Sequence, residues 1–207
     1  MSDPILFYFD FSSPYGYFAA LKIDDLAAGF ERDVIWRPMM LGAAMKVTGS
    51  KPLAEVEIKG DYCKHDWDRL SRFMGVPWTM PEKFPIASLA VSRAFYWLDD
   101  VNPEMAKRFA LAAFDAYFGH GRDITDPDIV AELAMEQGIE PEGLLAAVQD
   151  PAVKQRLKDE TVNAIEAGVF GSPYIIVDGE GFWGADRLWM VKRWLRSGGW
   201  EKIKRKI

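Results

Sequence analysis

A short apolar segment near the start of the chain is followed at once by a helix signal. Residues 4–11 (PILFYFDF) are almost continuously apolar and aromatic, which predicts a buried strand. Ser13 and Pro14 then open a helical pattern that ends at Gly29, because serine caps helices and proline suits their first turn. Residues 34–36 (VIW) predict a second strand. Two strands joined by a helix of about four turns favour a parallel pair with a right-handed crossover, so the chain is expected to be α/β.

The middle of the chain carries helical patterns and no strand pattern. Apolar side chains recur at helical spacing after Cys63 and again around Phe109. We therefore predict a helical block of residues 42–150, inserted into an α/β unit made of residues 1–41 and 151–207.

The last part of the chain predicts a helix, a hairpin and a final helix. Residues 153–165 carry an apolar helical stripe that Gly168 ends, and residues 174–183 form a hairpin pattern around an Asp-Gly turn. Asp186 is expected to begin the final helix. The predicted order is β-α-β, a helical insert, and α-β-β-α.

Composition excludes several classes of function. The 207 residues are 49% hydrophobic and 27% charged, which is a globular balance that fits one domain. A net charge of −6 leaves no basic surplus to neutralise phosphates, so no nucleic-acid partner is expected, and basic residues 202–206 are interpreted as a solvated helix end. No apolar run approaches the roughly 18–20 residues that span a bilayer, and the first residues lack a signal-peptide pattern. We therefore expect no membrane partner and a cytoplasmic location.

The cysteine and the histidines offer little chemistry by their spacing. Cys63 is the single cysteine, so no internal disulfide can form, and its place on an apolar stripe favours a buried structural thiol. His65 and His120 have no partner at metal-ligand spacing, so no metal site is expected.

Ser13 has two compatible interpretations. As a helix cap it contributes about 1 kcal/mol of stability. As a functional group it lies at the positive end of the helix dipole, beside unpaired N–H groups that favour an anion such as a thiolate. Its hydroxyl can donate one further hydrogen bond, and together these effects would lower the pKa of a bound thiol from about 8.5.

Three other residues have a structural and a functional interpretation. Pro173 can be a structural proline just before a strand, of the kind found at sheet edges. Alternatively, it can form a loop whose backbone pairs with a peptide-like ligand. Asp186 can cap the last helix or pair with a ligand amino group. Lys46 can be an ordinary surface lysine or can meet a ligand carboxylate.

Three separated motifs occur in order along the chain: residues 7–15 (FYFDFSSPY), 169–173 (VFGSP) and 181–188 (GFWGADRL), supported by residues 41–49, 59–62 and 75–81. Together they resemble the 2-hydroxychromene-2-carboxylate isomerases. These enzymes are close relatives of the kappa-class glutathione transferases within the DsbA-like thioredoxin superfamily. The resemblance covers nearly the whole chain and implies a thioredoxin-like α/β fold with a large inserted all-helical domain.

The resemblance implies glutathione as a bound, reusable cofactor. Ser13 matches the family's serine that holds the glutathione sulfur, and Ser172 and Pro173 match the loop that meets the tripeptide backbone. Lys46 falls where the family places a lysine that touches substrate or glutathione. Asp186 falls where an aspartate meets the γ-glutamyl end.

Other positions match less closely. Phe84 matches a pocket position of the family, and Ala185, in the glutathione-binding segment, stands where a polar residue is common. Residues 49–52 (GSKP), with Ser50, stand where relatives often have Gly-Asn. These departures leave Ser13 and Pro173 intact.

The resemblance implies a glutathione-dependent cis-trans isomerase with an aromatic small-molecule substrate, and a homodimer. A kappa-like transferase that releases the glutathione adduct is the nearest alternative. A disulfide oxidoreductase is disfavoured because residues 13–16 (SPYG) contain neither cysteine that thiol exchange requires. A non-enzymatic module that binds peptides through the Pro173 loop is the remaining alternative.

Overall fold

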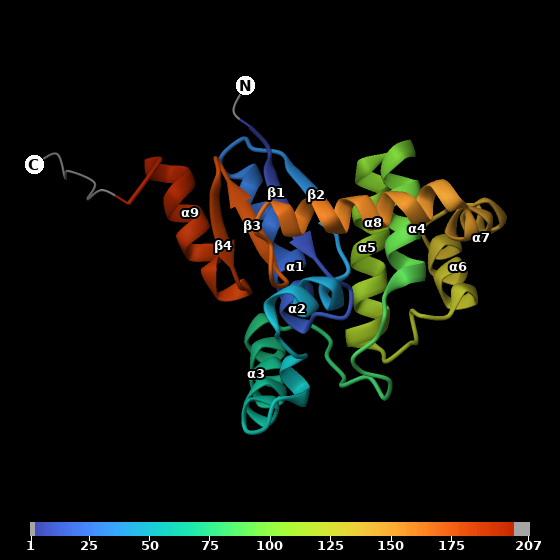
Figure 1. The fold of residues 1–207 in the computed structure, drawn as a ribbon, viewed down its shortest axis with the longest axis horizontal. Coiled ribbons are helices and arrows are strands. Elements are labelled where there is room, and N and C mark those ends of the chain that lie inside the picture. Colours follow the sequence, from blue (N-terminus) through green and yellow to red (C-terminus); the bar gives the residue numbers. More distant parts are fainter. Residues whose placement is uncertain (1–2, 201–207) are drawn as a thin grey trace, which may run out of the picture.

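The computed structural model describes residues 3–200 and has the element order that the sequence predicts (Figure 1). Its four-stranded sheet has the order β2-β1-β3-β4. Strand β1 is parallel to β2 and antiparallel to β3, which is in turn antiparallel to β4. The strands are β1 (Ile5–Phe9), β2 (Val34–Pro38), β3 (Tyr174–Val177) and β4 (Glu180–Trp183), so β1 ends at Phe9 and not at Phe11 as predicted.

Strand β1 is buried on both faces because each face has its own helical cover. Phe7 and Phe9 belong to the larger hydrophobic cluster, together with residues of α1 (Pro14–Ala28). Tyr8 points the other way and joins a smaller cluster with Ala164 of α8 (Pro151–Glu166). In Figure 1, α8 runs across the sheet towards the helices on the far side of β2. Period-two alternation of side chains explains why a nearly continuous apolar run suits this strand.

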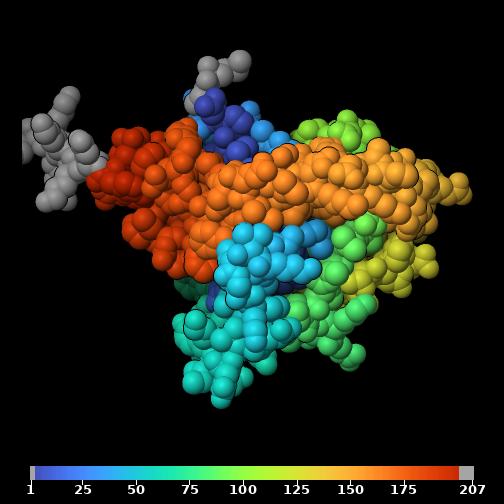
Figure 2. Space-filling model, viewed as in Figure 1, coloured from blue at the N-terminus to red at the C-terminus, as the bar shows by residue number. Residues whose placement is uncertain are grey.

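The segment between the two halves of the sheet is helical, as predicted. Pro103, Pro127, Pro141 and Pro151 each stand in a first helical turn, where proline's missing N–H is tolerated. In this segment the elements are α2 (Leu41–Thr48), the 3₁₀ turn η1 (Leu53–Glu55), α3 (Lys59–Met74), α4 (Leu89–Val101), α5 (Pro103–Phe114), the π-helical turn η2 (Asp115–Gly119), α6 (Pro127–Glu136) and α7 (Pro141–Gln149). Helix α3 forms a projection from the body of the molecule (Figure 2).

The sheet and the helical segment share a core. Phe9 of β1 contacts Phe95 of α4 and Phe114 of α5, with ring centroids 6.0 and 5.6 Å apart. The division at residues 42 and 150 stays a prediction, and basic residues 202–206 lie outside the described residues. None of the helices within residues 3–200 is long and apolar enough to cross a membrane.

The C-terminal hairpin confirms one prediction and the element after it corrects another. Asp178 and Gly179 both have positive φ, 52° and 83°, as the tight Asp-Gly turn requires. Asp186 does not begin or cap the last helix, because α9 (Leu188–Ser197) starts after the 3₁₀ turn η3 (Ala185–Arg187). The reason lies in Gly184, whose positive φ of 111° and N–H bond to the Pro173 carbonyl turn the chain sharply before the helix.

Candidate functional site

Ser13 lies where β1 passes into α1, and it caps that helix as predicted. Its Oγ accepts a hydrogen bond from the backbone N–H of Gly16 at 3.0 Å. The same hydroxyl donates to the carbonyl oxygen of Ser172 at 2.9 Å, although the two serines are 159 residues apart in sequence. Ser13 is only 6% exposed. The fold therefore brings together the two segments that the sequence motifs predicted to meet.

The Ser172–Pro173 peptide bond is cis, and only part of the backbone before the proline is free. The carbonyl of Ser172 accepts the bond from the Ser13 hydroxyl. Within residues 3–200, no hydrogen bond uses the backbone N–H of Ser172 or that of Tyr15 in the first turn of α1. Two N–H donors are thus unpaired within residues 3–200, one in the helix that Ser13 caps and one in the residue whose carbonyl Ser13 bonds.

Asp10 lies beneath Ser13 and was missed by the sequence reasoning. Its carboxylate is 2% exposed and accepts hydrogen bonds from the backbone N–H groups of Ser12 and Leu41 and from the Ser88 hydroxyl, each at 2.8 Å. Burial raises the pKa of Asp10, and these hydrogen bonds oppose that shift. The available signal was an aspartate inside a run of apolar and aromatic residues.

An aromatic row leads away from Ser13 to Phe84. The ring of Tyr15 contacts Trp67 of α3 at a centroid distance of 6.0 Å, and Trp67 contacts Phe84 at 5.7 Å. The Tyr15 hydroxyl donates to the Asp66 carboxylate at 2.8 Å. The pKa of Tyr15 is raised, mainly by burial and secondly by this hydrogen bond. Cys63, nearby on α3, is buried, and burial raises the pKa of its thiol, as suits a structural cysteine.

The remaining predicted site residues lie on separate surfaces. Lys46 is exposed in the last turn of α2, and Asp186 is exposed and paired with Arg187 at 2.6 Å. Ala185 is half-buried against the larger core cluster. No hydrogen bond or ion pair within residues 3–200 joins Lys46 or Asp186 to Ser13. The Gly184–Pro173 backbone bond at 3.0 Å connects the turn of Asp186 to the Ser172–Pro173 loop.

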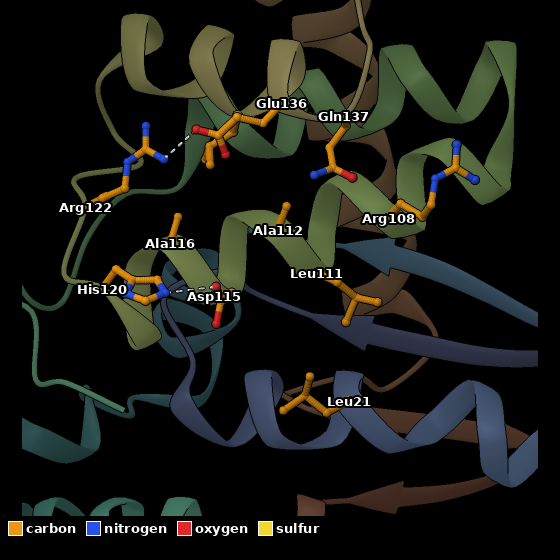
Figure 3. Close-up of a pocket in the computed structure, with 11 residues that line it drawn as sticks. Leu21, Arg108, Leu111, Ala112, Asp115, Ala116, His120, Arg122, Glu136 and Gln137 are labelled. Carbon is orange, nitrogen blue, oxygen red and sulfur yellow. Dashed lines mark hydrogen bonds and ion pairs between the residues drawn. The ribbon is translucent and has the colours of Figure 1, made fainter. Parts of the chain in front are cut away.

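A large hollow lies elsewhere, between α1, α5 and α6 (Figure 3). It encloses about 600 Å³, and its lining contains none of the predicted site residues. Several of its polar side chains are paired locally, Arg122 with Glu136 at 3.1 Å and His120 with Asp115 at 3.2 Å, whereas Arg108 has no ion pair within residues 3–200. Surface pairs of this kind contribute little energy and do not converge on a ligand position.

The Ser13 end has the donors that a peptidic thiolate needs. Three groups point to this use: the Ser13 hydroxyl, the free N–H of Tyr15 and the free N–H of Ser172. The first two lie at a helix N-terminus, where negative charge is stabilised. The third lies on an extended loop, where it can pair with a ligand backbone. The residues present therefore fit a small thiol peptide.

Comparison with known proteins gives a consistent family. The model of the DSBA-like thioredoxin domain matches residues 4–196. The 2-hydroxychromene-2-carboxylate isomerase of Sphingobium xenophagum is 29% identical over 94% of this chain and 99% of its own length. The human glutathione S-transferase kappa 1 is 27% identical over 87% of this chain and 85% of its own.

Solved structures agree with the sequence comparisons. A 2-hydroxychromene-2-carboxylate isomerase superposes with a TM-score of 0.83 at 26% identity, over 91% of this chain and 92% of the other. A probable DsbA oxidoreductase from Streptomyces coelicolor has a TM-score of 0.79 at 16% identity, over 97% and 92% of the two chains, which shows a shared fold. Because the domain model matches nearly the whole of this chain, the chain belongs to the DsbA-like thioredoxin family.

Proposed function

We propose that the protein is a glutathione-dependent cis-trans isomerase that acts on 2-hydroxychromene-2-carboxylate or a similar enone. The observation that carries the proposal is the pairing of the Ser13 hydroxyl with the Ser172 carbonyl at the N-terminus of α1. Relatives named as this isomerase, aligned over nearly the full length of the chain, support the choice of reaction.

Glutathione is the thiol peptide that we assign to this site. Ser13 and the Tyr15 N–H would receive its sulfur, and the N–H of Ser172 would pair with its backbone. Lys46 and Asp186, both exposed, would meet its charged ends. When bound, glutathione supplies a thiolate that adds reversibly to the conjugated enone, so that rotation about the former double bond can precede its departure.

The chain's own part in this reaction is electrostatic. The α1 dipole, the Ser13 hydroxyl and the Tyr15 N–H all favour the anionic form of a bound sulfur. They therefore lower the pKa of the thiol below its usual value of about 8.5 and raise the thiolate fraction at neutral pH. The helix dipole and the Tyr15 N–H are built into the fold and need no reorganisation during the reaction, whereas the Ser13 hydroxyl would exchange its bond to the Ser172 carbonyl for one to the sulfur.

The aromatic row suits a flat aromatic substrate. Tyr15 and Phe84 are half-buried, and Trp67 between them is fully buried. A ring stacked on the half-buried Tyr15 and Phe84 gains hydrophobic burial as well as edge or face contacts, while the buried Trp67 packs against both. We assign this row to the substrate side of the site.

A kappa-like transferase is the second candidate, supported by the kappa-class relatives. Both reactions need the same activated sulfur, and they differ in whether glutathione is recovered. Homodimer formation and a cytoplasmic location stay predictions.

The test is to incubate the protein with 2-hydroxychromene-2-carboxylate and glutathione and to separate the products by chromatography. We expect the trans ring-opened isomer and full recovery of glutathione. A stable glutathione adduct would favour the transferase, and no conversion with any enone tested would reject both enzymes.

The role of Ser13 is tested in the same assay and by the ultraviolet absorbance of bound thiolate. Ser13→Ala should lower kcat/KM by about 100-fold or more, the usual effect of losing one preorganised donor. Ser197→Ala is the matched control, since that hydroxyl bonds only Arg193 and Gly199 within residues 3–200, at the end of α9. Survival of the thiolate absorbance in Ser13→Ala would contradict the role of the serine.

A further inference from the structure

Asp10 is a buried carboxylate to which the proposed reaction assigns no task. It follows β1 directly and is 2% exposed. A carboxylate is costly to bury unless its oxygens are paired. Because its backbone carbonyl accepts a hydrogen bond from the N–H of Ser13, the partners of its side chain bear on the position of that serine.

The Asp10 side chain connects the beginnings of three helices. Oδ1 accepts from the N–H of Ser12, just before α1, and from the hydroxyl of Ser88, and Oδ2 accepts from the N–H of Leu41, the first residue of α2. The residue at the N-cap of α2, Met40, makes no capping bond of its own. Asp10 therefore supplies from the sheet the cap that α2 lacks locally.

Ser88 strengthens this interpretation. It stands at the N-cap of α4, where serine normally bonds its own helix, yet it makes no side-chain capping bond. Its hydroxyl, 0% exposed, donates to Asp10 instead. A local cap is thus given up for a contact with the carboxylate.

The backbone of Asp10 reaches the site directly. Its carbonyl accepts from the N–H of Ser13 at 2.9 Å, and its N–H donates to the Oγ of Ser172 at 2.9 Å. One residue therefore touches both site serines through its backbone and the starts of α2 and α4 through its side chain. Helix α2 also carries Lys46.

We propose that Asp10 is a positioning residue, whose carboxylate holds the Ser13 turn in register with α2 and α4. The inference rests on the proposed function only in taking glutathione as the ligand that the Ser13 turn receives.

A side chain with two acceptor oxygens suits this place. All three partners are donors, and a carboxylate accepts on both oxygens without presenting a donor. Asparagine has nearly the same shape, but one of its two ends is an NH₂ group, which would face at least one of these donors. Burial raises the pKa of Asp10, and the hydrogen bonds from Ser12, Leu41 and Ser88 oppose that shift.

The experiment compares wild-type protein with Asp10→Asn and, as a milder variant, Ser88→Ala, which removes one donor and leaves the carboxylate. Amide hydrogen exchange at Ser12, Ser13 and Leu41 is measured by NMR without ligand, and glutathione affinity by calorimetry. In Asp10→Asn, we expect exchange at Leu41 to speed up and glutathione to bind about tenfold more weakly, the usual effect of losing one charge-assisted bond. In Ser88→Ala, we expect exchange at Leu41 to be about threefold faster and glutathione to bind about threefold more weakly.

Each outcome decides the inference. Unchanged exchange at Ser13 and Leu41 in Asp10→Asn would overturn it, and so would faster exchange with unchanged glutathione affinity, because the carboxylate would then only stabilise the fold. If Asp10→Asn does not fold, Ser88→Ala decides by the same two measurements. If wild-type protein does not bind glutathione, the proposed function fails, and the ligand-free exchange at Ser13 still supports or overturns the positioning role.

Discussion

The start and the middle of α1 lie in very different surroundings. At its start, Ser13, Ser172 and Asp10 form a buried polar cluster that joins segments 159 to 162 residues apart. Further along, Leu21 faces the hollow of about 600 Å³ in which Arg122 and Glu136 form a surface ion pair. The first region has polar groups that converge from distant segments, and the second has space and polar groups that are mostly paired with near neighbours.

The difference shows which observation locates chemistry in this molecule. The volume of a hollow shows only where side chains pack loosely. Buried polar groups that converge from distant segments are costly to place, so their arrangement is the more informative signal. The following variants test this contrast, from the largest expected effect to the smallest.

Gly16→Ala should damage the Ser13 end without removing any functional group. The added Cβ would lie 3.1 Å from Ser172 Oγ and 3.2 Å from Ser13 Cβ, so one serine has to shift. We expect kcat/KM for the isomerase reaction to fall about tenfold or more, because small misplacements are costly at reacting groups.

Stability should separate this effect from unfolding. Alanine is favoured over glycine in helices by about 0.8–1 kcal/mol, which offsets the strain, so the melting temperature of Gly16→Ala should change little. Gly29→Ala, at the other end of α1, is the control, since its nearest contact is an ordinary 3.5 Å. Equal kcat/KM values in Gly16→Ala and Gly29→Ala would contradict the special sensitivity of the Ser13 end.

Ser172→Ala should destabilise the fold by about 1–3 kcal/mol, because the buried N–H of Asp10 loses its acceptor. Urea unfolding measures the change. Ser92→Ala removes a serine hydroxyl that is even more deeply buried, 3.5 Å from its neighbour Ser88, and should cost clearly less. Equal losses would mean that the Asp10–Ser172 bond has no special weight.

Arg122→Ala tests the hollow. The variant loses ion pairs with Glu132 and Glu136 that are open to solvent, so its unfolding free energy should fall by about 0–1 kcal/mol. Isomerase activity and glutathione affinity should equal those of wild-type protein. A large loss of either would show that the hollow, and not the Ser13 end, holds the ligand.

The pH dependence of stability should have opposite signs in the two regions. Burial raises the pKa of Asp10, so its contribution to stability is present at acidic pH and is lost as pH rises through the folded-state pKa. Hydrogen bonds from Thr125, and then Lys83, lower the pKa of Asp123 beside the hollow, so its contribution is lost as pH falls below about 4.

Unfolding of wild-type, Asp10→Asn and Asp123→Asn proteins between acidic and neutral pH checks these signs. The stability difference between wild type and Asp10→Asn should shrink as pH rises. The difference for Asp123→Asn should shrink as pH falls, and by only about a few tenths of a kcal/mol, because that carboxylate is 41% exposed. Slopes of the same sign would contradict the opposite pKa shifts.

Local signals in the sequence were sufficient for most of the fold. The Ser13–Pro14 cap and the Asp178–Gly179 turn each act within a few residues, and the structure confirms both. Asp186 was assigned wrongly because capping depends on a turn at Gly184 that bonds Pro173, a tertiary contact.

The site was only partly predictable for the same reason. The meeting of Ser13 and Ser172 followed from motifs and the fold that they imply. The bonds of Asp10 to Leu41 and Ser88 join residues that are 31 and 78 positions away, and no local pattern encodes them. The bond between Tyr15 and Asp66 is another of this kind.

The hydrogen bond between the Ser13 hydroxyl and the Ser172 carbonyl has a consequence for selectivity. A sulfur ligand has to compete for a hydroxyl that is already satisfied. A thioether is a weak acceptor and gains little from that exchange, whereas a thiolate gains a charge-assisted bond. The site should therefore select the charge of the sulfur more than the shape of the peptide around it, and S-alkylated peptides should leave it readily.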